Sequence, residues 1–248
     1  MAEERVPPVY TLIAGINGAG KTSLYTILKE GADLGVRINT DEMITGGGGD
    51  WRDNLEQLKA GRRAVTLIND CIDTGVSFHQ ETTLPGPTIL KYVRKAKAVG
   101  FEIRLYYVGV DSLDIAIERV RRRVARGGHG VDERIISKRY RALPENLSAL
   151  LPLCDLAVFY DNTSRFRQFA MIRHGRLVDF DREIPGWFFG IHGIRFYVSP
   201  QLPESTAHVA SQSLRFVPAN AVPGGTVIAP DANQSAGMPE INSSEDDI

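Results

Sequence analysis

Hydrophobic and polar positions follow two different spacings along the chain, and the spacing changes at short segments that contain glycine. Continuous apolar runs with β-branched residues, such as 9–14 and 101–110, predict buried strands. Apolar residues that recur every three or four positions, as in 51–74, predict helices with one buried face. Because strands and helices alternate, we expect an α/β fold with a mostly parallel sheet flanked by helices.

The same pattern indicates the order of the elements and one domain boundary. Strands are predicted at 9–14, at 35–44 (short, ending in a polar turn), at 76–80, 101–110 and 156–160, with a small terminal hairpin of 169–173 and 177–180. Helices are predicted at 23–29, 51–74, 87–99, 113–126, 132–143 and 145–151. From residue 199 the chain is acidic and rich in Pro, Ser and Ala. We therefore expect one folded domain over 1–198 and a disordered tail over 199–248.

One glycine-rich segment carries a specific chemical motif. Gly15-Ile16-Asn17-Gly18-Ala19-Gly20-Lys21-Thr22 fits G-x-x-x-x-G-K-[ST], the phosphate-binding P-loop, and lies between a predicted strand and a predicted helix. The N–H groups of such a loop and the positive end of the helix face one anion. Lys21 would reach the β- and γ-phosphates, and the Thr22 hydroxyl would bind Mg²⁺. The sequence thus predicts an ATP–Mg²⁺ site formed by Gly15, Asn17, Gly18, Ala19, Gly20, Lys21, Thr22 and Ser23.

Acidic residues follow two of the predicted strands. Ligands of open α/β folds bind beyond the carboxyl ends of the strands, so Asp41 and Glu81 are expected at the same edge as the P-loop. Asp41 is the candidate base for the proton of an acceptor hydroxyl; the alternative is that it only caps a helix. Glu81, with Thr82 and Thr83, is expected to bind the acceptor; the alternative is that Glu81 only binds the N–H groups of the two threonines.

Five arginines lie within 119–126, and four of them share one helix face. Arg119, Arg122, Arg123 and Arg126 are spaced by three and four residues, and Gly127-Gly128-His129-Gly130 follows them. This arrangement is typical of a lid that brings positive charge to a transferring phosphate on closure. The alternative is a solvated charged face. We expect Arg119 and Arg123 to be catalytic and Arg126 to bind the nucleotide.

Other polar and apolar residues lie outside these motifs. Arg139, beside Lys138, is expected to bind anionic groups of the substrate or to form surface salt bridges. Asn162 follows the last parallel strand, where a loop that contacts the nucleotide base would lie. His129 has no neighbours at metal-ligand spacing and is expected to be a loop histidine. The apolar segment 185–198 is expected to pack on the domain, with a membrane-surface or partner contact as the alternative.

The charge balance and the cysteines indicate the setting of the protein. The 248 residues carry a net charge of −1, but the part before residue 199 has 28 basic and 24 acidic residues, which suits an anionic substrate without requiring nucleic acid. Cys71 and Cys154 are far apart in apolar contexts and are expected to be buried free thiols. No apolar run approaches the about 18 residues of a membrane span, and no signal pattern begins the chain. We expect a cytoplasmic protein that binds neither nucleic acid nor membrane.

Several of these motifs occur in the same order in one known family. Over roughly residues 10–181, the chain resembles the zeta toxin family of P-loop kinases. The motifs that carry the resemblance are the P-loop, Asn39-Thr40-Asp41, Glu81-Thr82-Thr83-Leu84, the stretch from Arg119 to Val131, Arg139-Tyr140 and Tyr160-Asp161-Asn162. The resemblance implies a P-loop kinase fold and transfer of the ATP γ-phosphate to a sugar hydroxyl of UDP-N-acetylglucosamine. It implies these roles: ATP–Mg²⁺ binding for Lys21 and Thr22, the base for Asp41, the acceptor site for Glu81, and the γ-phosphate for Arg119, with Arg123 or Arg126 as a second arginine. One departure is Asp132, where compact members often carry proline.

These observations predict an ATP-dependent kinase that phosphorylates a hydroxyl of a small metabolite, and the resemblance favours a nucleotide-sugar. A free sugar, an antibiotic or a dinucleotide would be alternative acceptors. An alternative from a different functional class is a nucleotide-dependent binding module that hydrolyses ATP only slowly. Closure of this module on ATP would expose residues 187–198 to a partner protein. The resemblance also makes an antitoxin protein a candidate partner.

Overall fold

One sheet organises the chain, and its strands follow the order β2-β3-β1-β4-β5-β6-β7. The structure is a computed structural model that describes residues 6–189 and 191. The first five strands run parallel, whereas β6 and β7 are each antiparallel to the preceding strand. The strands are β1 (Val9–Ala14), β2 (Val36–Ile38), β3 (Phe78–Thr82), β4 (Glu102–Gly109), β5 (Leu156–Asp161), β6 (Arg167–Arg173) and β7 (Arg176–Phe180). The predicted tail, 199–248, lies outside the described residues.

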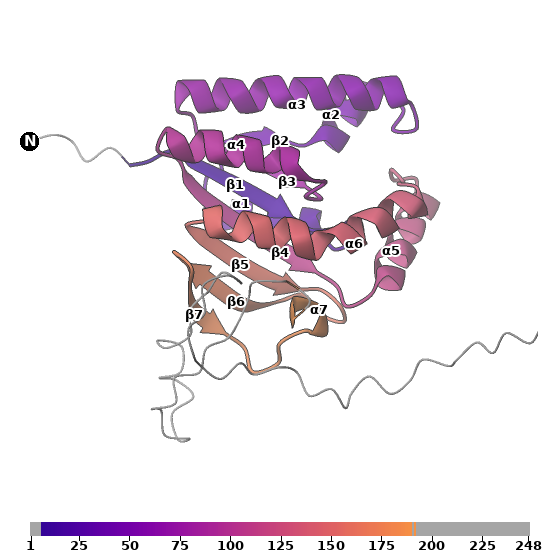
Figure 1. Cartoon of the computed structure of the whole chain (residues 1–248). Coiled ribbons are helices and arrows are strands. Elements are labelled where there is room, and N and C mark those ends of the chain that lie inside the picture. The colour runs from indigo at the N-terminus through magenta and orange to yellow at the C-terminus, as the bar shows by residue number, and fades with distance from the viewer. Residues whose placement is uncertain (1–5, 190, 192–248) are drawn as a thin grey trace, which may run out of the picture.

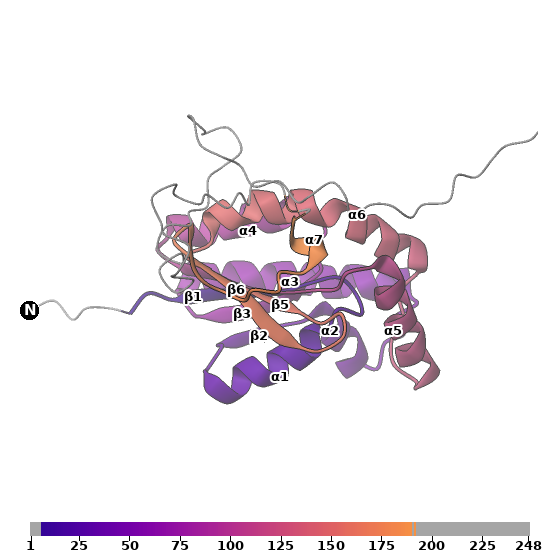
Figure 2. The ribbon, with the colours of Figure 1, turned by 90° about the horizontal axis from the view of Figure 1, so that it is seen from below.

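Helices cover both faces of this sheet. They are α1 (Lys21–Gly31), α2 (Thr40–Gly46), α3 (Asn54–Thr74), α4 (Pro87–Ala98), α5 (Leu113–Ala125), α6 (Glu133–Leu150) and α7 (Gly186–Phe189). Figures 1 and 2 show α1 on one face and α4 and α6 on the other, with α2 and α5 at the end toward which β1 points. The central strand is therefore enclosed, and Tyr10, Leu12 and Ile13 have no exposed surface. The predicted alternation of strands and helices is confirmed.

The segment 35–44 differs from its prediction. A strand covers only Val36–Ile38, and helix α2 follows almost at once. The cause is Asn39, whose side-chain oxygen accepts hydrogen bonds from the N–H groups of Asp41 and Glu42. The two acidic residues also lie at the positive end of the helix, which stabilises it. Asn39 is thus the N-cap, and the alternative in which Asp41 caps the helix is wrong.

A single helix, α6, replaces the two helices predicted at 132–143 and 145–151. Asp132 caps it by accepting a hydrogen bond from the N–H group of Arg134. Pro144 lies inside the helix and removes one backbone hydrogen bond. The helix nevertheless continues, because one buried apolar stripe extends across the proline, formed by Ile136, Leu143, Leu147 and Leu150.

The terminal hairpin and α7 form an aromatic cluster. Trp187 lies against the backbone of β4, since a Cβ atom at Gly109 would be 2.4 Å from Trp187 Cζ2. Phe188 is fully buried, with its ring edge-on to Phe159 and Phe169 at centroid distances of 4.9 Å and 5.0 Å. This part of the segment 185–198 therefore packs on the domain; residues 190 and 192–198 are outside the described part of the chain.

Two further expectations concern the core and the membrane. Cys71 and Cys154 are buried free thiols, as predicted. Burial raises the pKa of the Cys154 thiol, which keeps it protonated and unreactive. Of the helices within 6–189, none has both the length and the apolar character that crossing a membrane requires.

Candidate active site

The P-loop connects β1 to α1, and close packing explains its glycines. A Cβ atom at Gly15 would lie 2.3 Å from Val108 O, and one at Gly18 would lie 2.4 Å from Ala116 O. Both residues also have positive φ angles, 150° and 82°. Only glycine fits these positions, and its backbone leaves the N–H groups of the loop accessible to an anion.

Lys21 and Thr22 begin helix α1 and face a cavity of about 380 Å³. In this structure Lys21 Nζ donates a hydrogen bond to Ile16 O at 3.2 Å. Burial lowers the pKa of Lys21 to about 8, although the carboxylates of Glu81 and Asp41 oppose the shift. A phosphate beside the ammonium group would favour its charged form. Other P-loop residues that line this cavity are Asn17, Gly18, Gly20 and Ser23.

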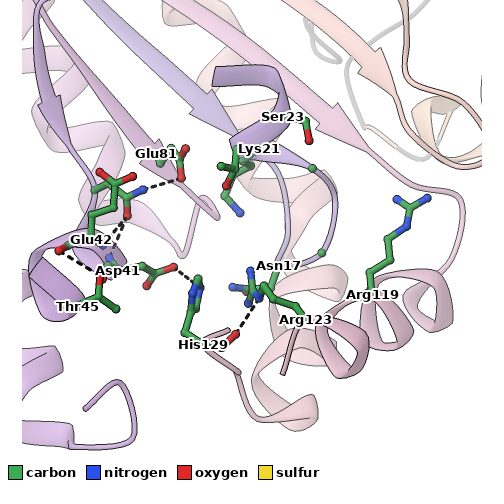
Figure 3. Close-up of a pocket in the computed structure, with 14 residues that line it drawn as sticks. Asn17, Lys21, Ser23, Asp41, Glu42, Thr45, Glu81, Arg119, Arg123 and His129 are labelled. Atoms are coloured by element: carbon green, nitrogen blue, oxygen red, sulfur yellow. Dashed lines mark hydrogen bonds and ion pairs between the residues drawn. The ribbon is translucent and has the colours of Figure 1, made fainter. Parts of the chain in front are cut away.

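Asp41 lies on the wall of the same cavity, in the first turn of α2 (Figure 3). Asp41 Oδ2 is 2.9 Å from His129 Nε2, and the Asp41 side chain is 50% exposed. The neighbouring His129 holds the pKa of Asp41 below its usual range against the opposing effect of burial, with support from Lys21 and Arg123. Asp41 is therefore ionised at neutral pH, which is the form that can accept a proton.

Glu81 is the next-to-last residue of β3 and the most buried carboxylate of this cavity, with 9% of its side chain exposed. Asn39 Nδ2 donates a hydrogen bond to Glu81 Oε2 at 2.8 Å, and Arg37 Nη2 lies 3.4 Å from Oε1. Burial raises the pKa of Glu81, while Lys21 and Arg37 oppose this shift. Its partners are these side chains and not the N–H groups of the following threonines, so that alternative is wrong.

The two candidate catalytic arginines extend in different directions. Arg119 Nη2 donates to Thr163 O at 3.0 Å, and Figure 3 shows the Arg119 side chain on the far side of the P-loop from Asp41. Arg123 Nε donates to His129 O at 2.8 Å, and Arg123 is among the charges that act on Asp41. His129 Nε2, Arg119 Nη1 and Arg123 Nη2 are all buried without a hydrogen-bond partner, and the contact of His129 Nε2 with Asp41 Oδ2 is an ion pair at 2.9 Å. Unpaired donors are costly, and in this cavity the two arginine donors fit the oxygens of a bound phosphate chain.

The remaining arginines of α5 do not face the P-loop cavity. Arg121 and Arg122 form ion pairs with Glu133 and Glu118 on the surface. Arg126 lines a separate cavity of about 420 Å³, together with Arg119, Arg122, Arg123 and Gly128. The outer arginines Arg121 and Arg122 therefore match the alternative of a solvated face, Arg126 lies on the same outer side, and the closing lid stays a prediction.

A second cavity, of about 500 Å³, adjoins the first one and shares Asn17, Asp41 and His129 with it. Arg139 reaches into this region from α6, where its Nη1 donates to Asn17 Oδ1 at 2.8 Å. Burial lowers the pKa of Arg139. The negative charge of Asp41 opposes this shift, so Arg139 and the candidate base interact electrostatically. The lining also includes residues that the sequence did not single out: Trp51, Arg52, Asn54 and Gln57.

Six predicted binding residues lie outside both cavities: Gly15, Ala19, Thr82, Thr83, Arg126 and Asn162. Thr82 is buried, and its hydroxyl accepts a hydrogen bond from Leu84 N. Thr83 and Ala19 line neither cavity. Asn162 Nδ2 donates to Ala19 O at 2.8 Å, so this asparagine holds the P-loop from behind. His129 is the main residue of the site that the sequence interpretation assigned to an ordinary loop.

The residues present fit a nucleoside triphosphate. The glycine loop, Lys21 and the two unpaired arginine donors supply positive charge and N–H groups along one cavity. Within the described residues, no group of three or more His, Cys, Asp or Glu side chains could hold a metal ion. Thr22 is the residue that would hold a Mg²⁺ ion, together with phosphate oxygens of the bound nucleotide.

Comparisons with known proteins agree with this fold and motif. A family model described as zeta toxin matches residues 2–165. An uncharacterized protein of Haemophilus influenzae is 32% identical over 126 residues, which make up 51% of this chain and 88% of that protein. The family and the fold together support a P-loop phosphotransferase that binds a nucleotide, as predicted from the sequence.

Two solved structures show the same fold at low sequence identity. A chain from the PezAT chromosomal toxin–antitoxin system of Streptococcus pneumoniae has a TM-score of 0.50 and 18% identity, over 64% of this chain and 70% of that chain. A chain from the AvrRxo1-ORF1:-ORF2 structure with ATP has a TM-score of 0.57 and 16% identity, over 80% of this chain and 66% of that chain. The predicted P-loop kinase fold and the predicted resemblance are confirmed: the chain belongs to the zeta toxin family.

Proposed function

We propose that this protein is an ATP-dependent kinase that transfers the γ-phosphate to a hydroxyl of a small metabolite. The observation that carries the proposal is that Lys21 of the P-loop and the ionised Asp41 of α2 line one cavity. Phosphoryl transfer needs positioned positive charge and a carboxylate beside the attacking hydroxyl, with little covalent chemistry by the protein. Lys21, Arg123 and Asp41 supply these groups from three different elements.

In the proposed reaction, Asp41 takes the proton of the acceptor hydroxyl, and the oxygen of that hydroxyl bonds to the γ-phosphorus. The bond between the γ-phosphorus and the bridging oxygen breaks, and ADP leaves. Lys21 and Arg123 bind the γ-phosphate oxygens as negative charge redistributes. Thr22 would hold a Mg²⁺ ion, which would supply further positive charge to the triphosphate. We assign Arg119 to the nucleotide and not to the γ-phosphate, because it contacts Thr163 beyond the P-loop.

The second cavity is the proposed acceptor site. A nucleotide-sugar carries an aromatic base, a diphosphate and sugar hydroxyls. Trp51 offers an aromatic face, Arg52 and Arg139 offer charge for a diphosphate, and the amides of Asn54 and Gln57 suit hydroxyl groups. The family resemblance makes UDP-N-acetylglucosamine the first candidate.

The alternative binding module finds less support in the packing. It requires Trp187 and Phe188 to be available to a partner, yet Phe188 is fully buried and Trp187 Nε1 donates to Asp161 Oδ1 at 3.1 Å. A partner that suits the proposal better is an antitoxin protein, since one structural neighbour belongs to a toxin–antitoxin system. We further propose that 1–198 forms the kinase domain and that the protein acts in the cytoplasm, where ATP is supplied.

The test is a product analysis. The purified protein is incubated with ATP and Mg²⁺ and, in turn, with UDP-N-acetylglucosamine, other nucleotide-sugars, free sugars and dinucleotides. We expect ADP release that depends on one acceptor class and a product whose mass has increased by one phosphate group. Release of ADP that no acceptor increases, with no phosphorylated product, would refute the kinase proposal and favour the binding module.

A further inference from the structure

His129 connects the two halves of the site. It lies in the loop between α5 and α6, and its Nε2 is 2.9 Å from Asp41 Oδ2 on α2 (Figure 3). Its backbone oxygen accepts a hydrogen bond from Arg123 Nε at 2.8 Å. One residue thus touches both the candidate base and the candidate phosphate arginine, and it lines both cavities.

The backbone on either side of His129 is closely packed. A Cβ atom at Gly128 would lie 2.7 Å from Arg123 Cγ, and one at Gly130 would lie 2.7 Å from Trp51 Cη2. The glycines of this loop therefore allow close contact with α5 and with the segment before α3, and do not only provide a hinge. The position of the imidazole follows from this packing, because the loop cannot shift away without breaking these contacts.

We propose that His129 is a positioning residue that fixes the Asp41 carboxylate and joins it to the phosphate arginine Arg123. The inference rests on the proposed kinase function and adds a role within that same site. His129 lines both cavities, but its role in the reaction is exerted through Asp41. Its Nε2 pairs with Oδ2 at 2.9 Å and thereby leaves Oδ1 free for the acceptor hydroxyl, whose proton passes to Asp41 as the new O–P bond forms and ADP departs.

The link to Arg123 connects phosphate binding to the base. Arg123 Nε holds the His129 carbonyl, whereas Nη2 is buried without a partner and remains available to a γ-phosphate oxygen. A phosphate on Nη2 would immobilise Arg123 and with it the loop that holds Asp41. Besides His129, the charged groups that interact with Asp41 lie on α1, α2, β3, α5 and α6: they are Lys21, Glu42, Glu81, Arg123 and Arg139.

The test compares His129→Gln, which keeps an N–H donor near the Nε2 position, with His129→Leu, which does not. The matched control is His174→Asn, since His174 is also near an aspartate, at 3.7 Å from Asp155, but lies in the β6–β7 turn. Three readouts are taken on the full chain: kcat and KM for the acceptor, the pH dependence of kcat, and the carboxyl ¹³C NMR titration of Asp41, assigned by its absence in Asp41→Asn.

We expect His129→Leu to lower kcat by about 10- to 100-fold, the effect of losing one polar partner of a charged group, with little change in KM. The neighbouring His129 holds the pKa of Asp41 low, so its removal moves the acid limb of the kcat profile and the NMR titration to higher pH. His129→Gln should recover part of the rate, and His174→Asn should match the wild type.

Two results would overturn the positioning role. Unchanged kcat and an unchanged Asp41 titration in His129→Leu would show an ordinary loop histidine. Loss of rate in His129→Gln as complete as in Asp41→Asn, with no shift of the Asp41 titration, would make His129 itself the base. Failure of the kinase proposal looks different, because the wild type would then show no acceptor-dependent transfer while the NMR titration still reports whether His129 controls Asp41.

Discussion

Asn39 Nδ2 donates a hydrogen bond to Glu81 Oε2 at 2.8 Å, while Asn39 Oδ1 accepts one from Asp41 N at 3.0 Å. One amide side chain thus fixes the helix that carries the candidate base and the carboxylate that ends the neighbouring strand. The parallel register of β2 and β3 makes this possible, since Ile38 pairs with Gln80 and the next residues of each strand lie side by side. The carboxylates of Asp41, in the first turn of α2, and of Glu81, near the end of β3, are therefore held as one unit.

Replacing Asn39 tests that unit. Asn39→Ala removes the N-cap of α2 and the partner of Glu81, so we expect the free energy of unfolding to fall by about 1 kcal/mol and the transfer rate to fall as well. Ser112→Ala is the matched control, because Ser112 caps α5 by accepting a hydrogen bond from Ile115 N. Chemical denaturation and acceptor-dependent ADP release are measured on both variants. If Asn39→Ala and Ser112→Ala lost the same unfolding free energy and both kept the wild-type rate of ADP release, Asn39 would be only a helix cap.

The buried Lys21 predicts a specific pH dependence. Its pKa is about 8 in the folded protein against an ordinary value of 10.5, so between these values the unfolded chain binds a proton that the folded, ligand-free protein has lost. Stability of the ligand-free protein therefore rises as pH rises through this window. Binding of a non-hydrolysable ATP analogue should weaken above about pH 8, because the neutral amine no longer attracts phosphate.

The measurement compares the wild type with Lys21→Met at constant ionic strength. Thermal unfolding and analogue binding are followed from pH 7 to pH 10, the range in which Lys21 is expected to titrate. The difference between the two proteins isolates Lys21 from other titrating groups. A difference that does not vary with pH would contradict the assignment of a lowered pKa to this lysine.

The loop after α5 gives a prediction about packing. Gly130→Ala would place a Cβ atom 2.7 Å from Trp51 Cη2 and 2.8 Å from Val124 Cγ2, so the loop must shift and carry His129 away from Asp41. We expect a clear loss of acceptor turnover. The control is Gly61→Ala inside α3, where no atom lies within 4 Å of the new Cβ, and it should stabilise the protein by about 0.5–1 kcal/mol. Full activity in Gly130→Ala would show that this loop position is not critical.

The aromatic cluster separates a structural role from partner binding. Phe188→Ala empties a fully buried position and should cost about 3–5 kcal/mol of unfolding free energy. Leu58→Ala, at a side chain that is 60% exposed on α3, should cost no more than about 0.5 kcal/mol. Both values come from denaturant unfolding. A small loss in Phe188→Ala, together with loss of a bound partner, would instead support the binding module.

The sequence was sufficient for the parts of the site that depend on local patterns. The P-loop motif located Lys21 and Thr22, and the rule that ligands collect at strand ends brought Asp41 and Glu81 to the same cavity. The N-cap signal of α2 was present in the sequence as Asn39 followed by two acidic residues, but the apolar residues around it favoured a longer strand. A stricter reading of the capping pattern would have found this helix.

Other parts of the site depend on contacts between distant segments. Arg139 binds Asn17 across 122 positions, and nothing near Arg139 in the sequence indicates that partner. His129 looked ordinary because its significance comes from the placement of α2 against the α5–α6 loop. The direction of Arg119 was also not predictable, since helical spacing assigns a face but not the end point of a long side chain.

The central claim is that Asp41 serves the transfer step and not nucleotide binding. The most direct measurement is the rate of acceptor phosphorylation by Asp41→Asn at saturating ATP, alongside its dissociation constant for a non-hydrolysable ATP analogue. We expect the rate to fall by at least about 100-fold while the dissociation constant stays within about twofold of the wild type, because a general base acts on the attacking hydroxyl and not on the bound nucleotide. An equal loss of binding and of rate, or full activity in this variant, would contradict the account.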